Sequence, residues 1–188
     1  MAPMSLSKDY QELLLEIARN SIQQGLLTGK PLQIDITDYP EKIQERMASF
    51  VKISLYQELR GCIGVLEALR PLVIDVSENA FAAAFRDSRF PIVNIEEFKD
   101  LEIHLSLLTS AEPIVFNSEE ELITLLNPGI DGLILEEGRR RGTFLPSVWE
   151  ALPRPEQFLR HLKQKAGLPA EYWSDEIRMF RYRTEVIS

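Results

Sequence analysis

The chain has 188 residues, of which 45% are apolar and 27% are charged, and its 21 basic and 29 acidic side chains give a net charge of −8. This composition predicts an ordinary globular protein with one domain over residues 1–188, with room for a small lobe around residues 110–150. The acidic balance opposes attraction to phosphate backbones, so general nucleic-acid binding is not expected.

Neither a membrane span nor a secretion signal is expected. No apolar run approaches the roughly 20 residues that cross a bilayer, and residues 1–8 lack a basic flank followed by an apolar stretch. The single cysteine, Cys62, cannot form an internal disulfide. The cytoplasm is therefore the expected compartment.

The first half of the chain predicts a helix, a hairpin and a second helix. Residues 7–25 carry apolar side chains at helical spacing, and Ser7 or Asp9 can cap the helix. The stretch "ASFVKISL" (48–55) alternates as a strand does, and residues 59–66 return as its hairpin partner. Pro71 suits the first turn of a helix with an apolar stripe, which ends before Phe90-Pro91.

The second half alternates shorter elements. In order, we expect a strand at 101–107, a helix at 118–126, a strand at 130–135, a turn at 138–142, helices at 146–152 and 155–166, and a closing strand at 176–187. Strands and helices do not alternate regularly, as they would in a series of parallel βαβ units. The predicted class is therefore α+β with a largely antiparallel sheet.

The segment "LRGCIG" (59–64) places the only thiol between two glycines. Alternation along a strand would put Arg60 and Cys62 on one face, where the guanidinium would lower the pKa of the thiol. Gly61 and Gly64 would let a substrate approach the backbone closely. The alternative is that Cys62 is a small buried residue in a glycine-kinked strand.

Two histidines offer acid–base chemistry. His104 lies on the polar face of the strand at 101–107 and is a candidate general base, able to pair with Cys62 if their strands are adjacent. His161 lies in a helix near lysines and is expected on the surface. No CxxC or HExxH spacing is present, so no metal site is predicted.

Three further stretches carry polar groups, each with two interpretations. In "RDSRFP" (86–91), Arg89 can clamp a carboxylate or phosphate and Asp87 can orient it or act as an acid or base, or the arginines simply complement a helix end. Thr143 in "GTFLP" can offer a hydroxyl to a substrate, or mark a strand that ends at a proline. Arg139–Arg141 is either a basic patch or a solvated turn.

The motifs GxGxxG, GxxxxGKS and GxSxG are absent from the sequence. The commonest nucleotide-binding and hydrolase motifs are therefore excluded.

Six segments in a fixed order carry a family resemblance. They are "LRGCIG", "AAAFRDSRFP", "LEIHLSLLT", "GIDGLILEEGRRRGTFLPSVWE", "FLRHLKQKAGLP" and "RYRTE". Together, over residues 48–185, they resemble the AMMECR family, whose bacterial members are called protein A of the AmmeMemoRadiSam system. Two positions depart from the pattern: Ser49 stands where a glycine is common, and Ile92 where a second proline is usual.

The resemblance implies an α+β fold in which two strand-and-helix repeats form one barrel-like sheet of the RAGNYA type. It also implies two partners, a Memo-type protein resembling extradiol dioxygenases and a radical SAM enzyme. The residues that match the family's motifs are Arg60–Gly64, Asp87, Arg89–Pro91 and Gly142–Pro146. Neither the residues nor the resemblance indicates a cofactor or a reaction.

Three functions follow as hypotheses. The first is an enzyme or enzyme component that acts on a small molecule or nucleotide. Its catalytic candidates are Cys62, His104 and Asp87, and its substrate-binding candidates are Arg60, Gly61, Gly64, Arg89 and Thr143. The second is a noncatalytic module that docks a Memo-type or radical SAM partner through the "RGCIG" segment. The third is nucleotide or RNA binding through Arg60, Arg89 and Arg139–Arg141, which the net charge opposes.

Overall fold

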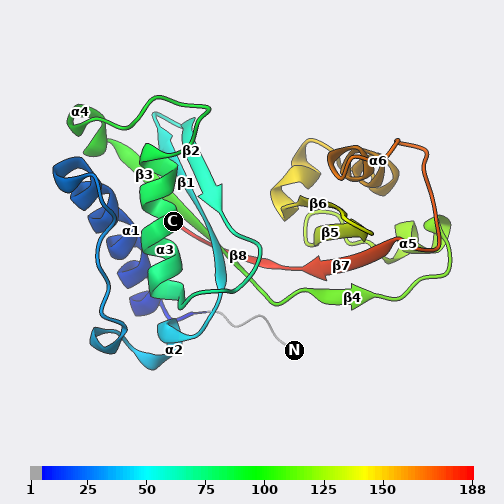
Figure 1. Cartoon of the computed structure of the whole chain (residues 1–188), viewed down its shortest axis with the longest axis horizontal. Helices are drawn as coiled ribbons and strands as arrows, with labels where there is room; N and C mark the ends of the chain where they lie inside the picture. Colours follow the sequence, from blue (N-terminus) through cyan, green and yellow to red (C-terminus); the bar gives the residue numbers. More distant parts are fainter. Residues whose placement is uncertain (1–5) are drawn as a thin grey trace. The chain divides into compact units, whose positions relative to one another are not determined.

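The computed structural model describes residues 6–188, which form two compact units, each built on a four-stranded antiparallel sheet (Figure 1). The first unit takes the described residues through Leu108 together with Glu185–Ser188, and the second takes Thr109–Thr184. The α+β class and the antiparallel pairing are confirmed. The single barrel-like sheet is wrong, since the strands of residues 6–188 belong to two separate sheets. Each sheet buries a face under helices, so neither has to close on itself to form a core.

The first sheet has the strand order β2-β1-β3-β8. Its unit contains, in chain order, α1 (Lys8–Thr28), η1 (Ile36–Asp38), α2 (Glu41–Gln44), β1 (Ala48–Leu55), β2 (Glu58–Gly64), α3 (Leu72–Phe85), α4 (Ile95–Phe98) and β3 (Leu101–Leu108), and the sheet is completed by β8 (Thr184–Ile187). Ser7 caps α1 by accepting a hydrogen bond from the N–H of Tyr10, and Gly29 ends it in the left-handed conformation at φ 70°. The bounds predicted for β1 are confirmed.

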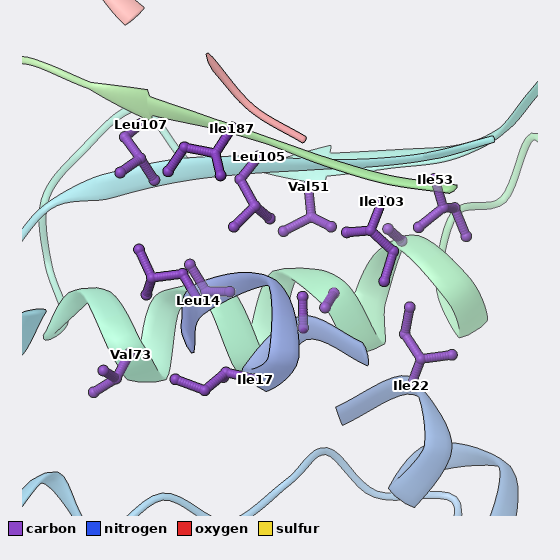
Figure 2. Packing of buried hydrophobic residues seen from close by; sticks show 14 of the residues in the cluster. Leu14, Ile17, Ile22, Val51, Ile53, Val73, Ile103, Leu105, Leu107 and Ile187 are labelled. Carbon is purple, nitrogen blue, oxygen red and sulfur yellow. The ribbon is translucent and has the colours of Figure 1, made fainter. Parts of the chain in front are cut away.

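The core of the first unit lies on one face of this sheet. Figure 2 shows the inward-pointing strand residues Val51, Ile53, Ile103, Leu105, Leu107 and Ile187 packed against Leu14, Ile17, Ile22 and Val73 of α1 and α3. Both helices therefore cover the same face. Because side chains alternate along a strand, Lys52 of β1 and His104 of β3 lie on the opposite face.

The second sheet has the order β4-β7-β5-β6. Its unit contains β4 (Glu112–Ile114), α5 (Glu119–Leu125), β5 (Gly132–Glu137), β6 (Arg140–Phe144), η2 (Pro146–Glu150), α6 (Pro155–Lys165) and β7 (Arg178–Tyr182). Its core includes Trp149 stacked on Phe158 with ring centroids 3.7 Å apart. The turn expected at 138–142 is shorter, because Gly138 turns the chain at φ 58° and β6 begins two residues later. The expected closing strand at 176–187 is two strands, one in each sheet.

Across residues 6–188, the structure holds no helix with both the length and the apolar character needed to span a bilayer.

Helix α3 packs directly on the backbone of β2 at Gly61. A Cβ atom built at this position would lie 2.1 Å from the carbonyl oxygen of Ala83, far closer than atoms approach in proteins. The alanines near the end of α3 have small side chains, which allow the helix to approach the strand closely. Gly61 thus serves a close approach of helix and strand within the fold.

Substitution Gly61→Ala should lower the free energy of unfolding by about 1–3 kcal/mol, since the added methyl group forces α3 away from β2. Urea denaturation followed by far-UV circular dichroism measures the change. The control is Lys52→Ala on the neighbouring strand, where the exposed side chain should change stability by no more than about 0.5 kcal/mol. Equal stability of the Gly61→Ala and wild-type proteins would refute this packing role.

Candidate functional site

Two side chains that follow α3 bind the backbone of Cys62. The N–H of Cys62 donates to Oδ2 of Asp87 at 2.9 Å, and Nη2 of Arg89 donates to the carbonyl oxygen of Cys62 at 3.0 Å. The N–H and C=O of one residue in an antiparallel strand point to the same side. Because β2 is an edge strand, these groups would otherwise be open to another chain, and the pair closes this stretch of the edge.

Asp87 and Arg89 also bind each other. Nε and Nη2 of Arg89 donate to the two carboxylate oxygens at 2.9 and 2.6 Å. The Asp87 side chain is 4% exposed and that of Arg89 is 56% exposed. The hydrogen bonds from Arg89 outweigh burial and hold the pKa of the Asp87 carboxyl far below its usual range. Asp87 is therefore ionised at neutral pH and poorly suited to carry a proton in catalysis.

The thiol of Cys62 shares a face of the first sheet with Lys52 and His104. Lys52 lies opposite Cys62 on one side and opposite His104 on the other, and directly opposite residues of antiparallel strands share a face. We call the face that carries these three residues, opposite α1 and α3, the thiol face. Strand β1 separates β2 from β3, so Cys62 and His104 are two strand spacings, about 10 Å, apart. The adjacent strands needed for a thiol–imidazole pair are not found.

Burial raises the pKa of the Cys62 thiol, and the opposing effects of the Arg89 and Lys52 cations do not cancel it. The direction is opposite to that expected from the sequence. The cations near the sulfur are also not the expected one, because Arg60 is not among them. A thiol with a raised pKa is protonated at neutral pH and is a weak nucleophile.

Arg60 binds the segment that leads into α4. The pairing between β1 and β2 shifts register at this residue, which leaves Arg60 as the extra residue of a bulge. Its guanidinium makes two hydrogen bonds to the carboxylate of Glu97, at 2.9 and 3.0 Å, and two more to the carbonyl oxygens of Pro91 and Ile92. The side chain is mostly buried. Arg60 therefore fixes a loop, and its guanidinium already makes four hydrogen bonds within the fold.

Gly64 is half-buried and packs against Phe50 and the backbone of Ser49, whose own side chain is buried. A Cβ at Gly64 would lie 2.3 Å from the ring of Phe50 and 2.5 Å from the carbonyl oxygen of Ser49. The buried hydroxyl of Ser49 donates to Asp75 at 2.7 Å, and Asn79 donates to the Ser49 carbonyl at 3.0 Å. The departure from the family pattern at position 49 is thus accommodated by a buried hydrogen-bond network.

Thr143 lies in the second unit and connects strands there. Its hydroxyl donates to the carbonyl oxygen of Leu133 at 2.9 Å and lies 3.2 Å from the hydroxyl of Tyr182. Burial raises the pKa of Tyr182 to about 12.

The remaining candidate residues also belong to the second unit. Arg139–Arg141 fall within it, and His161 is exposed there as predicted. The site candidates brought together by direct contacts are Cys62, Asp87 and Arg89.

Two residues of this region were missed from the sequence. Lys52 is the one charged residue of "ASFVKISL", and the alternation of that strand already placed it on the polar face. Glu97, the partner of Arg60, closes a capping box with Asn94, and the spacing Asn-x-x-Glu was the available signal. Within residues 6–188, no three His, Cys, Asp or Glu side chains gather closely enough to hold a metal ion.

Comparison with known proteins gives consistent matches over nearly the whole chain. The family model AMMECR1 matches residues 15–187. A protein of Methanothermobacter thermautotrophicus is 37% identical over 96% of this chain and 95% of its own length, and one of Methanocaldococcus jannaschii is 36% identical over 88% and 84%. The crystal structure of an uncharacterized protein from Pyrococcus horikoshii is similar, with a TM-score of 0.86 and 34% identity over 96% of this chain and 92% of that one.

Substitution Asp87→Asn should destabilise the protein by about 1.5–3 kcal/mol at neutral pH, because charge-assisted hydrogen bonds to Arg89 and to Cys62 are lost or weakened. It should also flatten the acid limb of the stability curve. The pKa of Asp87 is depressed in the folded state, so its contribution is fully present above the unfolded value of about 4 and is lost as the pH falls through the folded value.

Urea denaturation between pH 2 and 7 measures this difference. Glu58→Gln is the matched control, since Glu58 is exposed on β2, the strand whose backbone Asp87 contacts. An Asp87→Asn variant with the same slope as wild type below pH 4 would contradict the assignment of this pH dependence to Asp87.

Proposed function

The chain belongs to the AMMECR1 family, and we propose that it is a noncatalytic binding module whose thiol face docks a partner protein. The proposed partner is a Memo-type or radical SAM protein, the kind that the sequence resemblance suggests. One observation carries the proposal: Asp87 and Arg89, the groups best placed to assist chemistry at Cys62, are both bonded to its backbone.

Catalysis at Cys62 would need a base, and the neighbouring groups do not supply one. Asp87 is held as a carboxylate by Arg89, and its Oδ2 accepts a hydrogen bond from the backbone N–H of Cys62. His104 is separated from the thiol by the whole of β1. A protonated thiol on a rigid strand can still donate a weak hydrogen bond and pack against a partner.

The chemistry of the thiol face indicates what it would recognise. Lys52 is exposed and has no ion pair within residues 6–188, and His104 lies beside it in the same row. Because the edge of β2 is closed at Cys62, a partner cannot add a strand there and must be recognised through side chains. A partner surface that presents carboxylates to Lys52 fits this arrangement.

Lys52→Glu should weaken binding to the partner by about tenfold or more, since it places a carboxylate against an acidic surface. Cys62→Ser should bind as wild type. Isothermal titration calorimetry against purified Memo-type and radical SAM proteins, each tested separately, measures both. Lys30→Glu is the charge-matched control, because Lys30 is exposed just after α1. The docking proposal is wrong if neither protein binds the wild-type chain, or if Lys52→Glu and Lys30→Glu bind equally.

A second candidate is an enzyme component that uses Cys62 as a nucleophile. The observation in its favour is that two cations, Arg89 and Lys52, lie close enough to the thiol to favour its ionised form. The two functions differ in the reactivity of the thiol.

The rate of alkylation of Cys62 by iodoacetamide, measured from pH 6 to 10, separates them. The binding function predicts an inflection above that of a free cysteine, because burial disfavours the thiolate. Reaction of the urea-unfolded chain supplies the reference curve. An inflection below the reference, with loss of an activity in Cys62→Ser, would favour the enzyme.

A further inference from the structure

The second unit contains a groove of about 610 Å³ between the segment after β4 and the segment that leads into β7. Its lining includes Phe116, Trp173, Asp175 and Arg178, and every lining residue falls within Thr109–Thr184. The volume lies in the range of about 300–1,000 Å³ that is typical of small-molecule sites. None of the residues of the thiol face contributes to it.

The groove offers apolar aromatic surface. Phe116 and Trp173 contact each other with ring centroids 5.7 Å apart and planes inclined at 57°. Ile177 and Met179, both part of the core of this unit, form a fixed apolar base. Val115 beside them is 84% exposed, so an apolar side chain is left in solvent at the rim. An apolar ring bound here would cover this surface.

The adjoining sheet edge does not suit a peptide strand. Strand β4 lies at the edge of the second sheet, and its middle residue is Pro113. Proline has no N–H to donate and is a common device for blocking strand addition at an edge. A small ligand held by side chains fits the groove better than an added strand.

The charged side chains that line the groove are Arg178 and Asp175. The Arg178 side chain is 70% exposed, and its ion pair within residues 6–188 is to Glu136 at 3.6 Å. The same carboxylate is 3.3 Å from Nε of Arg141, so two guanidinium groups share one negative charge.

The other polar groups of the groove are less available to a ligand. The polar groups of Asn117 and Ser174 are bonded to glutamates outside the groove. Asp175 also lines the groove, but no ion pair joins it to Arg178 in the described part of the chain.

We propose that this groove binds a small molecule that combines a flat apolar ring system with an anionic group. The ring lies against Phe116 and Trp173, and the anion pairs with the guanidinium of Arg178. The site is independent of the thiol face, and its test does not depend on the proposed docking function.

The probe is 1-anilinonaphthalene-8-sulfonate, which carries both features. We expect saturable one-to-one binding, seen as probe fluorescence excited through tryptophan. Phe116→Ala should abolish it, and Arg178→Gln should weaken it about tenfold, equivalent to about 1.4 kcal/mol. Asp175→Asn should bind as tightly as wild type or more tightly, because it removes a negative charge from the groove.

Controls separate this groove from adventitious probe binding. Arg160→Gln removes an exposed arginine that is paired with Glu171, neither of which lines the groove, and should leave binding unchanged. Trp149→Phe leaves Trp173 as the donor tryptophan and should preserve the signal, since Trp149 is buried in the core. Near-UV circular dichroism shows whether each variant is folded.

N-phenyl-1-naphthylamine, which has the same rings without the sulfonate, tests the need for the anion. It should bind at least about tenfold more weakly and be insensitive to Arg178→Gln. The proposal fails if the wild-type protein shows no saturable binding, if the neutral probe binds as tightly as the sulfonate, or if folded Arg178→Gln binds the sulfonate like Arg160→Gln.

Discussion

The contact between α3 and the backbone of β2 at Gly61 is the constraint on which the first unit depends. Because residue 61 has no side chain, the end of α3 comes close to the edge of the sheet. The chain that leaves α3 then has Asp87 and Arg89 within reach of the Cys62 backbone. The bulge at Arg60 directs its guanidinium to the next stretch, at Pro91 and Ile92. One close packing contact thus organises the whole region around the motif.

This arrangement changes the meaning of the "RGCIG" segment. A lone thiol beside an arginine and two glycines has the composition of a nucleophile site. In the structure, Gly61 and Gly64 accommodate backbone packing, and Arg60 ties down a loop. Burial sets the direction of the Cys62 pKa in spite of two nearby cations. A match to the motif is therefore explained by the packing requirements of the fold, and does not by itself indicate a catalytic reaction.

Local sequence signals predicted the helices and strands well, but they could not predict which distant strands pair with each other. The bounds of β1 and the cap of α1 follow from alternation and from Ser7, which act within a few residues. The insertion of β1 between β2 and β3, which separates Cys62 from His104, depends on pairing between distant segments. The same is true of residues 176–187, where one alternating stretch is divided between two sheets. Alternation specifies the face of a residue but not its neighbouring strand.

The two surfaces proposed for binding differ in what fixes their side chains. On the thiol face, β2 packs against α3 on its other side, and its edge is bonded to Asp87 and Arg89. Lys52 of β1 is exposed to solvent. The groove of the second unit is instead built on core side chains, with an arginine whose carboxylate partner is shared. Since each unit buries its own core, a charge change at Lys52 removes no contact from the groove. The two proposed binding functions can therefore be tested separately, by single substitutions in the full-length chain.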